Sequence, residues 1–476
     1  MTEYKPTIGL EIHAELKTQT KMFCNSKNDP DEKRPNVNVC PVCMGHPGTL
    51  PVINKEAVKH VLRVGVAVGG ELADFTEFDR KNYFYPDIPK GYQISQYAYP
   101  LVKGGSVGGV QLTRIHLEED TARSQHLSSE ASAKGGEGNY SLVDFNRAGV
   151  PLMELVTEPV IHSAKEAGDF ARELQLLLRT LGVSDADMEK GHLRVEVNIS
   201  VSKDETLGTK TEIKNINSFR AAEKAIAFEI ERQSAVLEEG GEVVQETRGW
   251  DDTKGETFSQ RKKESSHDYR YFPEPDLPKL KLSEIPEFNS ETLKASLPEL
   301  PWQKRERYLS LGLNLEDANM FLTNAPFGIF ADAFLEREKD EKAIKLGINL
   351  VATNLASLTE DPAGTKLTQE NFAGLVALRM GDAISSGAAV TILTKLVQDG
   401  GDAKEIAERE GLIQQSDIGA LEAIADTIIA ENSKVVADYK GGKENLLQFF
   451  VGQGMKATKG AGNPKVLQDI FKKKLS

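Results

Sequence analysis

Ionisable side chains recur at every second position in four segments of the sequence, residues 9–16, 113–120, 193–200 and 210–214. Alternate residues of a β-strand point to the same face, so each segment predicts a strand with one charged face. In the first segment, for example, Leu10 and Ile12 would lie on the opposite, apolar face. The four charged faces comprise Glu11, His13 and Glu15; Arg114, His116, Glu118 and Asp120; Arg194, Glu196 and Asn198; and Lys210, Glu212 and Lys214.

These faces gather side chains that bind divalent cations and phosphate. Carboxylates and imidazoles are ligands of Mg²⁺ or Mn²⁺, and guanidinium groups clamp phosphates. Crowded carboxylates repel one another, so bound cations would offset the repulsion and position a nucleotide. For any single strand, the alternative is a sheet with one face turned to water. Glu119 would face away from Glu118 unless a bulge reorients it. The sequence has no G-x-x-x-x-G-K-[ST] motif, so an ATP site here would not be a P-loop.

The three cysteines are spaced like part of a zinc site. Cys24 precedes the Cys40-x-x-Cys43 pair by fifteen intervening residues, which is near the spacing of a small zinc knuckle. A tetrahedral site needs a fourth ligand, for which His46 is a candidate, whereas Ser26 is a poor zinc ligand. The alternative is a set of reduced, partly buried thiols in a loop that folds without metal. Three cysteines cannot form a disulfide framework, so we expect reduced thiols.

Two other segments, residues 79–96 and 268–276, place basic residues among aromatic ones. This mixture suits stacking on a nucleobase with phosphate contacts alongside. The alternative is a pair of tyrosine-rich loops that pack on their own domain.

The remaining sequence predicts the elements that position these residues. A length of 476 residues suggests about three domains. Six prolines between residues 273 and 301 disfavour helix and central strand, so we place a boundary near residue 293. Before it, strand-like runs alternate with long helices, which predicts an α+β domain over residues 1–293. The rest reads as helical, with a break at Gly400-Gly401 that separates residues 294–400 from residues 401–476.

Two helices of the N-terminal domain have clear start and stop signals. Ser163 with Glu166 predicts a capping box, and Gly182 ends that helix. Ser218 caps the second helix. Apolar residues recur three and four positions apart in both, so we expect both helices to lie on a sheet.

Composition excludes several classes of protein. With 39% hydrophobic and 27% charged residues, neither global disorder nor a coiled-coil rod is expected. No apolar run approaches the roughly 18 residues that span a bilayer, and the N-terminus lacks a signal-peptide pattern, so we expect a cytoplasmic protein with no membrane partner.

The net charge is −14, yet residues 440–476 hold eight lysines against Glu444 and Asp469. This basic tail predicts a polyanionic partner such as RNA, or else a solvated lysine-rich helix end.

Seven segments in order resemble one known family. They are residues 8–13, 78–87, 114–120, 144–154, 188–194, 212–218 and 268–276. With these segments the chain resembles the B-subunit family of the bacterial aspartyl/glutamyl-tRNA(Asn/Gln) amidotransferases, and the resemblance extends from Ile8 into the C-terminal tail. The family usually has Cys-x-Cys before Cys-x-x-Cys. Here Ser26 stands at the second cysteine position.

The resemblance implies a fold and a reaction. It implies a catalytic cradle similar to glutamine synthetase with an antiparallel sheet, then a helical domain and a small all-α tail domain that binds tRNA. It also implies a heterotrimer in which the A subunit, an amidase, releases ammonia from glutamine and the small C subunit holds the other two together. The B subunit would use ATP and Mg²⁺ (or Mn²⁺) to phosphorylate the side-chain carboxylate of misacylated Glu-tRNA(Gln) or Asp-tRNA(Asn), and ammonia would displace phosphate. Which of the two tRNAs is the substrate is left open.

The resemblance also implies roles for individual residues. The implied metal ligands are Glu11, His13, Glu118, Glu119 and Glu154. Lys81 and Arg147 would contact phosphate or substrate. Glu196, Glu212 and Lys214 lie on the same charged faces and are further candidates for nucleotide contact. Cys24, Cys40 and Cys43 are the candidate ligands of a structural Zn²⁺.

Two other functions compete with this hypothesis. A non-catalytic RNA-binding protein would use the cysteine loop and the basic tail, but it would leave the clustered Glu and His residues unexplained. A metallohydrolase would use the same ligands to activate water, but the sequence has no H-E-x-x-H motif.

Overall fold

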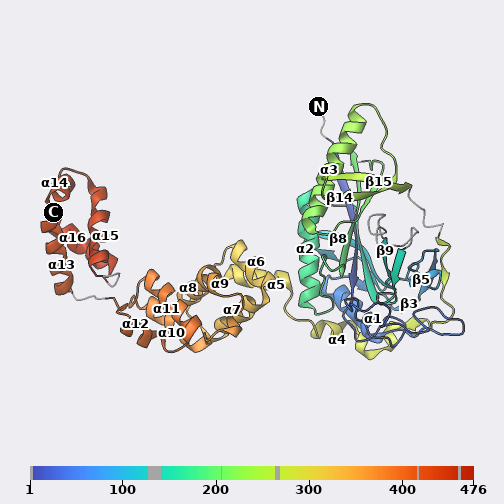
Figure 1. The fold of residues 1–476 in the computed structure, drawn as a ribbon, viewed down its shortest axis with the longest axis horizontal. Coiled ribbons are helices and arrows are strands. Elements are labelled where there is room, and N and C mark those ends of the chain that lie inside the picture. Colours follow the sequence, from blue (N-terminus) through green and yellow to red (C-terminus); the bar gives the residue numbers. More distant parts are fainter. Residues whose placement is uncertain are drawn as a thin grey trace, which may run out of the picture. The chain divides into compact units, whose positions relative to one another are not determined.

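In the computed structural model, the described residues are 4–126, 141–204, 206–262, 269–414, 418–458 and 462–475. The chain forms two compact units, Met1–Pro301 and Trp302–Ser476. Figure 1 shows the first as a sheet with helices and the second as helices. The α+β prediction for the N-terminal part and the helical prediction for the rest are confirmed. Among the described residues, no helix has the length and apolar character needed to cross a membrane.

One large sheet organises the first unit. Its strand order is β15-β14-β13-β12-β1-β11-β8-β6-β2, with β7 paired to β8. The bounds are β1 (Lys5–Glu15), β2 (Glu71–Leu72), β6 (Val102–Lys103), β7 (Ser106–Val107), β8 (Val110–Glu119), β11 (Pro151–Thr157), β12 (Leu193–Ser202), β13 (Thr211–Lys214), β14 (Glu246–Asp251) and β15 (Glu256–Lys262). Four of these strands, β1, β8, β12 and β13, correspond to the four segments predicted from the period-two pattern.

The sheet departs from the predicted antiparallel arrangement at one pair of strands. Strands β13 and β14 are parallel, whereas the other pairs described in this sheet are antiparallel. The reason is the connection, because helix α3 (Phe219–Glu238) joins β13 to β14 and returns the chain to the same end. A parallel pair requires such a crossover.

Helices cover the apolar face of this sheet. Helix α2 (Ala164–Thr180) packs against α3, and α3 packs against β12, as Figure 1 shows. Both predicted N-caps are present, since the hydroxyl of Ser163 accepts the N–H of Glu166 and that of Ser218 accepts the N–H of Ala221. The carboxylate of Glu166 accepts from the N–H of His162, so the predicted capping box is shifted by one residue. Helix α1 (Lys55–Ala67) packs near β8, and α4 (Ser290–Ala295) packs on α1.

Smaller sheets complete the first unit. Strand β16 (Phe272–Pro273) pairs with β4 (Asp79–Asn82), which pairs with β5 (Tyr92–Ser95). The pairs β9 (Arg123–His126) with β10 (Ser141–Asp144) and β3 (Phe75–Thr76) with β17 (Leu280–Lys281) are separate. The three-stranded sheet joins the two aromatic and basic segments noted in the sequence, although nearly two hundred residues separate them. Asp268, the first residue of the second segment, lies outside the described residues.

The second unit is helical and contains two hydrophobic cores. The helices are α5 (Pro301–Ser310), α6 (Leu315–Thr323), α7 (Ala325–Arg337), α8 (Glu341–Asn349), α9 (Ala356–Leu358), α10 (Gln369–Met380), α11 (Ser386–Asp399), α12 (Ala403–Arg409), α13 (Ile418–Glu431), α14 (Ser433–Lys440), α15 (Leu447–Ala457) and α16 (Pro464–Leu475), with a π-helical segment over Leu350–Leu355. One core extends from Tyr308 to Ala407, and the other from Leu421 to Leu475.

The first unit of the structure extends beyond the predicted boundary near residue 293, and one hydrophobic core extends across the predicted break at Gly400-Gly401. Residue 293 lies inside α4, where Leu293 is buried and the helix packs on α1, so the first unit continues to Pro301. At Gly400-Gly401 helix α11 does end, and both glycines have positive φ. However, α12 follows the break and buries Ile406 and Ala407 in the same core as α10. A loop that reverses direction within one core resembles a linker in sequence.

Candidate functional site

The three central strands of the large sheet bring carboxylates and imidazoles together. His13 of β1 lies opposite Glu154 of β11, and Glu154 lies opposite His116 of β8. Glu154 Oε2 is 3.4 Å from Nε2 of both histidines. His13 Nε2 is also 3.7 Å from Glu118 Oε1 and 3.9 Å from Glu11 Oε1. These five residues, Glu11, His13, His116, Glu118 and Glu154, are called the carboxylate–imidazole cluster below.

The electrostatics of this cluster favour a bound cation. Burial lowers the pKa of His13, but Glu154, Glu118 and Glu11 outweigh burial and raise it to about 9. Burial and the charge of Glu154 raise the pKa of Glu11. Burial likewise opposes ionisation of Glu154, yet His116 and His13 hold its pKa well below the usual range. The cluster therefore attracts a proton to His13 where a divalent cation could bind instead. Two overlapping sets of donor atoms, Glu11-His13-Glu154 and His116-Glu118-Glu154, each lie within 4.8 Å of one another.

A cavity of about 260 Å³ opens beside this cluster. Three cationic side chains line it, Lys81, Arg114 and Lys214. Arg114 Nη2 lies 3.3 Å from Glu154 Oε1, and Lys214 Nζ lies 2.7 Å from Glu196 Oε2. Burial disfavours a charge on Lys81, but Glu118 and Glu154 raise its pKa above the usual range, so its ammonium stays charged. The other lining residues are Glu11, Ser95, Gln96, Tyr97, His116, Glu154, Glu212, Thr247, Tyr269 and Tyr271.

Most of the residues predicted from the sequence lie at this cavity. Glu11, Lys81, Glu154, Glu212 and Lys214 line it. His13 and Glu118 belong to the carboxylate–imidazole cluster, and Glu196 reaches the site through Lys214. Two predicted residues, Glu119 and Arg147, lie elsewhere.

Glu119 does not join the other candidate metal ligands. It is the last residue of β8 and keeps the period of two, so its carboxylate points away from Glu118. Glu119 Oε1 pairs with Lys90 and accepts the N–H of Ile94 at 2.9 Å. The irregularity in the β8–β11 pairing lies at the other end of the strand, between Val156 and Thr157. The bulge that would have reoriented Glu119 is therefore not at this position.

Arg147 holds a turn next to the sheet instead of lining the cavity. Its guanidinium lies 3.5 Å from Asp120 Oδ2 and donates to the carbonyls of Thr121 and Ala122 at 3.0 and 3.1 Å. Asp120 also pairs with Arg194. Burial raises the pKa of Asp120, but the two arginines outweigh burial and lower it below its usual range.

Several residues of the site were missing from the predicted ligand set. His116 and Arg114 belong to the charged face of residues 113–120, so their pattern contained the signal. Ser95, whose hydroxyl donates to Glu118 Oε2 at 3.1 Å, comes from β5 and had no such signal. Tyr97 directly follows the first aromatic segment, and Tyr271 belongs to the second. Only the fold shows that these two tyrosines meet.

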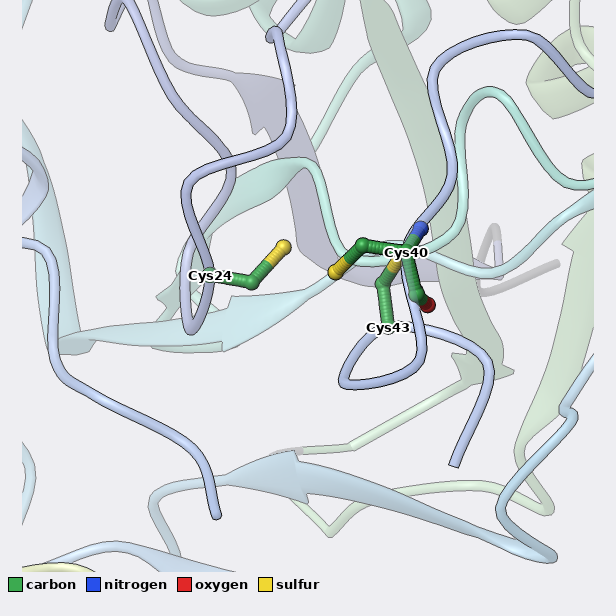
Figure 2. A group of neighbouring side chains, drawn as sticks. All are labelled: Cys24, Cys40 and Cys43. Carbon is green, nitrogen blue, oxygen red and sulfur yellow. The ribbon is translucent and has the colours of Figure 1, made fainter. Parts of the chain in front are cut away.

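The three cysteines form a second candidate site, shown in Figure 2. The Sγ atoms of Cys24, Cys40 and Cys43 lie within 4.8 Å of one another, as a shared metal ion would require. Ser26 Oγ lies 3.9 Å from Cys43 Sγ. His46 lines the neighbouring cavity of about 100 Å³, but within the described part of the chain its ring is not among the clustered donors.

A buried lysine accompanies the thiols. Lys21 is fully buried, and its Nζ lies 3.9 Å from Cys43 Sγ and 3.3 Å from the carbonyl of Phe145. A hydrogen bond from Cys24 and the charge of Lys21 outweigh burial and lower the pKa of Cys43 to about 5. The same hydrogen bond, with burial, raises the pKa of Cys24. Among the three thiols, these contacts favour ionisation of Cys43, although burial also lowers the pKa of Lys21.

Comparisons with known proteins place the chain in a family. A family model described as the GatB/GatE catalytic domain matches residues 6–286, and one described as the GatB domain matches residues 329–475. Over its whole length the chain is 43% identical to the B subunit of the aspartyl/glutamyl-tRNA(Asn/Gln) amidotransferase of Gloeothece citriformis, covering 98% of that protein. It is 44% identical to the chloroplastic/mitochondrial B subunit of the glutamyl-tRNA(Gln) amidotransferase of Physcomitrium patens, covering 86% of that protein. Because both units are matched and identity extends over the full length, the chain belongs to the amidotransferase B-subunit family with a GatB/GatE catalytic domain.

Proposed function

We propose that this chain activates the side-chain carboxylate of a misacylated Glu-tRNA(Gln) or Asp-tRNA(Asn), so that ammonia converts it to the amide. Its relatives are named as subunits of tRNA(Asn/Gln) amidotransferases. The observation that carries the proposal is the carboxylate–imidazole cluster, which adjoins a cavity with three cationic side chains. Neither a solvated sheet face nor a simple RNA-binding surface needs buried carboxylates at such close range.

The chemistry explains why both charge types are required. A carboxylate is a poor electrophile, because its oxygen is a poor leaving group. Transfer of the γ-phosphoryl group from ATP to this oxygen gives an acyl phosphate and ADP. Ammonia then attacks the carbonyl carbon, the C–O bond breaks, and phosphate leaves with its electron pair. The phosphoryl transfer brings several anions together, so cations must surround the site.

The residues of this chain supply that environment. Lys81, Arg114 and Lys214 would offset the charges of the phosphates and of the substrate carboxylate. The carboxylate–imidazole cluster would hold Mg²⁺ or Mn²⁺, since carboxylates are ligands of both ions and an imidazole, although unusual for Mg²⁺, is acceptable for Mn²⁺. A divalent cation, when bound, offsets the negative charge that builds up on the transferred phosphoryl group. Glu212, which accepts a hydrogen bond from Thr247 Oγ1 at 2.7 Å, also lines the cavity, as does Lys214 two residues further along β13.

The proposal includes partners and a compartment. The relatives' designation as B subunits implies a multi-subunit amidotransferase. We infer a heterotrimer with an amidase (the A subunit), which supplies ammonia, and a small third protein (the C subunit), acting in the cytoplasm. The second unit would bind the tRNA through helices such as α16, whose last turn holds Lys472, Lys473 and Lys474. The three thiols would supply three ligands to a structural Zn²⁺, with water as the fourth.

Glu118→Gln tests the proposal, because it keeps the size of the side chain and removes one charge from the cluster. In the reconstituted complex, with ATP, Mg²⁺ and ammonium, we expect amidation of misacylated tRNA to fall by about 10²- to 10⁴-fold. Filter binding should give an unchanged tRNA affinity. Glu71→Gln, an exposed position of β2, is the control and should keep the normal rate. A normal rate for Glu118→Gln would mean that the face is solvated surface, and equal loss of rate and tRNA affinity would mean that Glu118 is structural.

A further inference from the structure

Two tyrosines stack face to face at the wall of the active-site cavity. The rings of Tyr97 and Tyr271 have centroids 4.3 Å apart and an interplanar angle of 12°. Both residues line the cavity. Tyr97 is 55% exposed, so one of its faces covers Tyr271 while much of the side chain remains open to solvent. An open aromatic face of this kind offers a platform on which a nucleobase can stack.

Both halves of the stack are anchored to strand β4, through its consecutive residues Asp79 and Arg80. The N–H groups of Tyr97 and Ala98 donate to the buried carboxylate of Asp79 at 2.9 and 3.4 Å. The segment of Tyr271 continues into β16, where Arg80 binds both carboxylate oxygens of Glu274 at 2.6 and 2.7 Å. The side chain of Glu274 is fully buried. Because of these anchors, the exposed ring does not have to be ordered when a ligand binds, which lowers the entropic cost of stacking.

The charged residues of the site act on Tyr271, one member of the stack. Burial, followed by the charges of Glu118 and Glu154, raises the pKa of Tyr271 to about 12, and Lys81 opposes this effect. Tyr271 lines the same cavity as Glu11 and Glu154 of the cluster, and Tyr97 stacks on Tyr271. A nucleoside stacked on Tyr97 would therefore lie at the wall of the cavity that adjoins the cluster.

We propose that the exposed face of Tyr97 binds the 3′-terminal adenine of the aminoacylated tRNA and so positions the aminoacyl group in the cavity. The inference rests on the proposed function and adds to it the protein group that receives the end of the substrate. Adenine stacks on aromatic rings, and a basic surface tracks the preceding phosphates. Phe272, which follows Tyr271, is exposed, and the guanidinium carbon of Arg80 lies 5.7 Å from its ring centroid.

Adenine also occurs in ATP, but the position of the stack favours the tRNA. The cations Lys81, Arg114 and Lys214 line the interior of the cavity and suit the phosphates of the nucleotide. Tyr97 is exposed, at 55%, and suits a single-stranded end that arrives from outside. The end of a tRNA is unpaired, so its terminal base is free to stack on such a ring.

The test compares Tyr97→Ala, Tyr97→Phe and the control Tyr99→Ala in the reconstituted amidotransferase with ammonium as nitrogen donor. Tyr99 is also exposed, at 45%, but it packs edge-on against Phe75 and does not line the cavity. We expect Tyr97→Ala to raise the KM for misacylated tRNA by about tenfold or more, as loss of one base–aromatic stack predicts, with little change in the KM for ATP. Tyr97→Phe keeps the ring and should restore the wild-type KM, and Tyr99→Ala should leave both constants unchanged.

A stable substrate mimic provides a second measurement that does not depend on folding of a variant. 3′-Deoxy-3′-(glutamylamino)adenosine carries the adenine, and the corresponding sugar without a base does not. With the wild-type complex, the adenine-bearing compound should inhibit about tenfold more strongly, and Tyr97→Ala should abolish the difference.

Each contrary outcome has a distinct meaning. A raised KM for ATP alone would assign the stack to ATP and overturn the inference. Equal inhibition of the wild type by both compounds, or an unchanged tRNA KM in Tyr97→Ala, would also overturn it. The proposed function fails separately, if the wild-type complex does not amidate misacylated tRNA at all.

Discussion

Replacing Glu154 with glutamine should lower the pKa of His13, because Glu154 provides its closest carboxylate. His13 Nε2 lies 3.4 Å from Glu154 Oε2, against 3.7 Å for Glu118 and 3.9 Å for Glu11. Together these groups outweigh burial and raise the pKa of His13 from its usual 6.5 to about 9. That rise corresponds to about 3 kcal/mol. Removal of the nearest charge should return about 1 to 2 pKa units, placing the value near 7 to 8.

The sign of the pH dependence follows from the raised value. Protonated His13 stabilises the folded, metal-free protein fully below pH 6.5, and this contribution is lost as pH rises through about 9. The same proton competes with a divalent cation for the imidazole, so Mn²⁺ affinity should rise with pH up to about 9 in the wild type. In Glu154→Gln, Mn²⁺ affinity should stop rising at a lower pH, near the lowered pKa of His13.

An NMR titration of the histidine imidazoles in the full chain, with EDTA, measures this directly. His13→Asn identifies the resonance. Glu158→Gln is the matched control, because Glu158 directly follows β11 but bonds to Thr113 Oγ1 at 2.8 Å and does not act on His13. A pKa of His13 that stays near 9 in Glu154→Gln, or one that falls equally in the control, would refute the assignment of Glu154 as the main partner.

Three further outcomes are expected. Arg80→Met should destabilise the first unit by about 3 kcal/mol or more in denaturant unfolding, because it leaves the buried carboxylate of Glu274 unpaired. Lys281→Met, at the exposed ion pair with Glu284, should cost less than about 1 kcal/mol, and similar losses for the two variants would contradict this. A chain ending at Gln414, without α13–α16, should bind tRNA more weakly and with a shallower salt dependence. The slope of log affinity against log salt concentration should change by roughly 0.7 to 0.9 for each lost phosphate contact. Equal slopes for the full and the shortened chain would mean that these helices do not bind tRNA. The isolated chain should amidate misacylated tRNA with ammonium but not with glutamine, because its sequence has no recognisable amidase nucleophile. Efficient glutamine-dependent turnover by the pure chain would contradict the proposed division of labour with an amidase subunit.

The register of the sheet explains why the site was only partly predictable. A period of two identifies which residues share a face of one strand, and for β1 and β8 this prediction is confirmed by the burial of Leu10, Ile12, Ile115 and Leu117. It does not say which strands are neighbours or which residues lie opposite. That Glu154 lies between His13 and His116 depends on the order β1-β11-β8 and on its register.

For Glu119 and Arg147, the family resemblance implied roles at the site that the structure does not support. The period of two correctly turned Glu119 away from Glu118, and its place beside Lys90 follows from that orientation. Arg147 lies in a segment typical of the family, but its guanidinium is occupied by Asp120 and two carbonyls. Proximity in sequence to a candidate ligand such as Glu154 does not imply proximity of the side chain.

The sequence by itself determined the class of the fold, the family, the caps at Ser163 and Ser218, and the charged faces, because these depend on short-range patterns and on local hydrogen bonds. The tertiary structure decided which distant residues meet. It brought Cys24 to Cys43 beside Lys21, and Tyr97 to Tyr271 at the wall of the cavity. Such contacts between distant segments are set by strand order, register and packing of the whole unit, and no local periodicity encodes them.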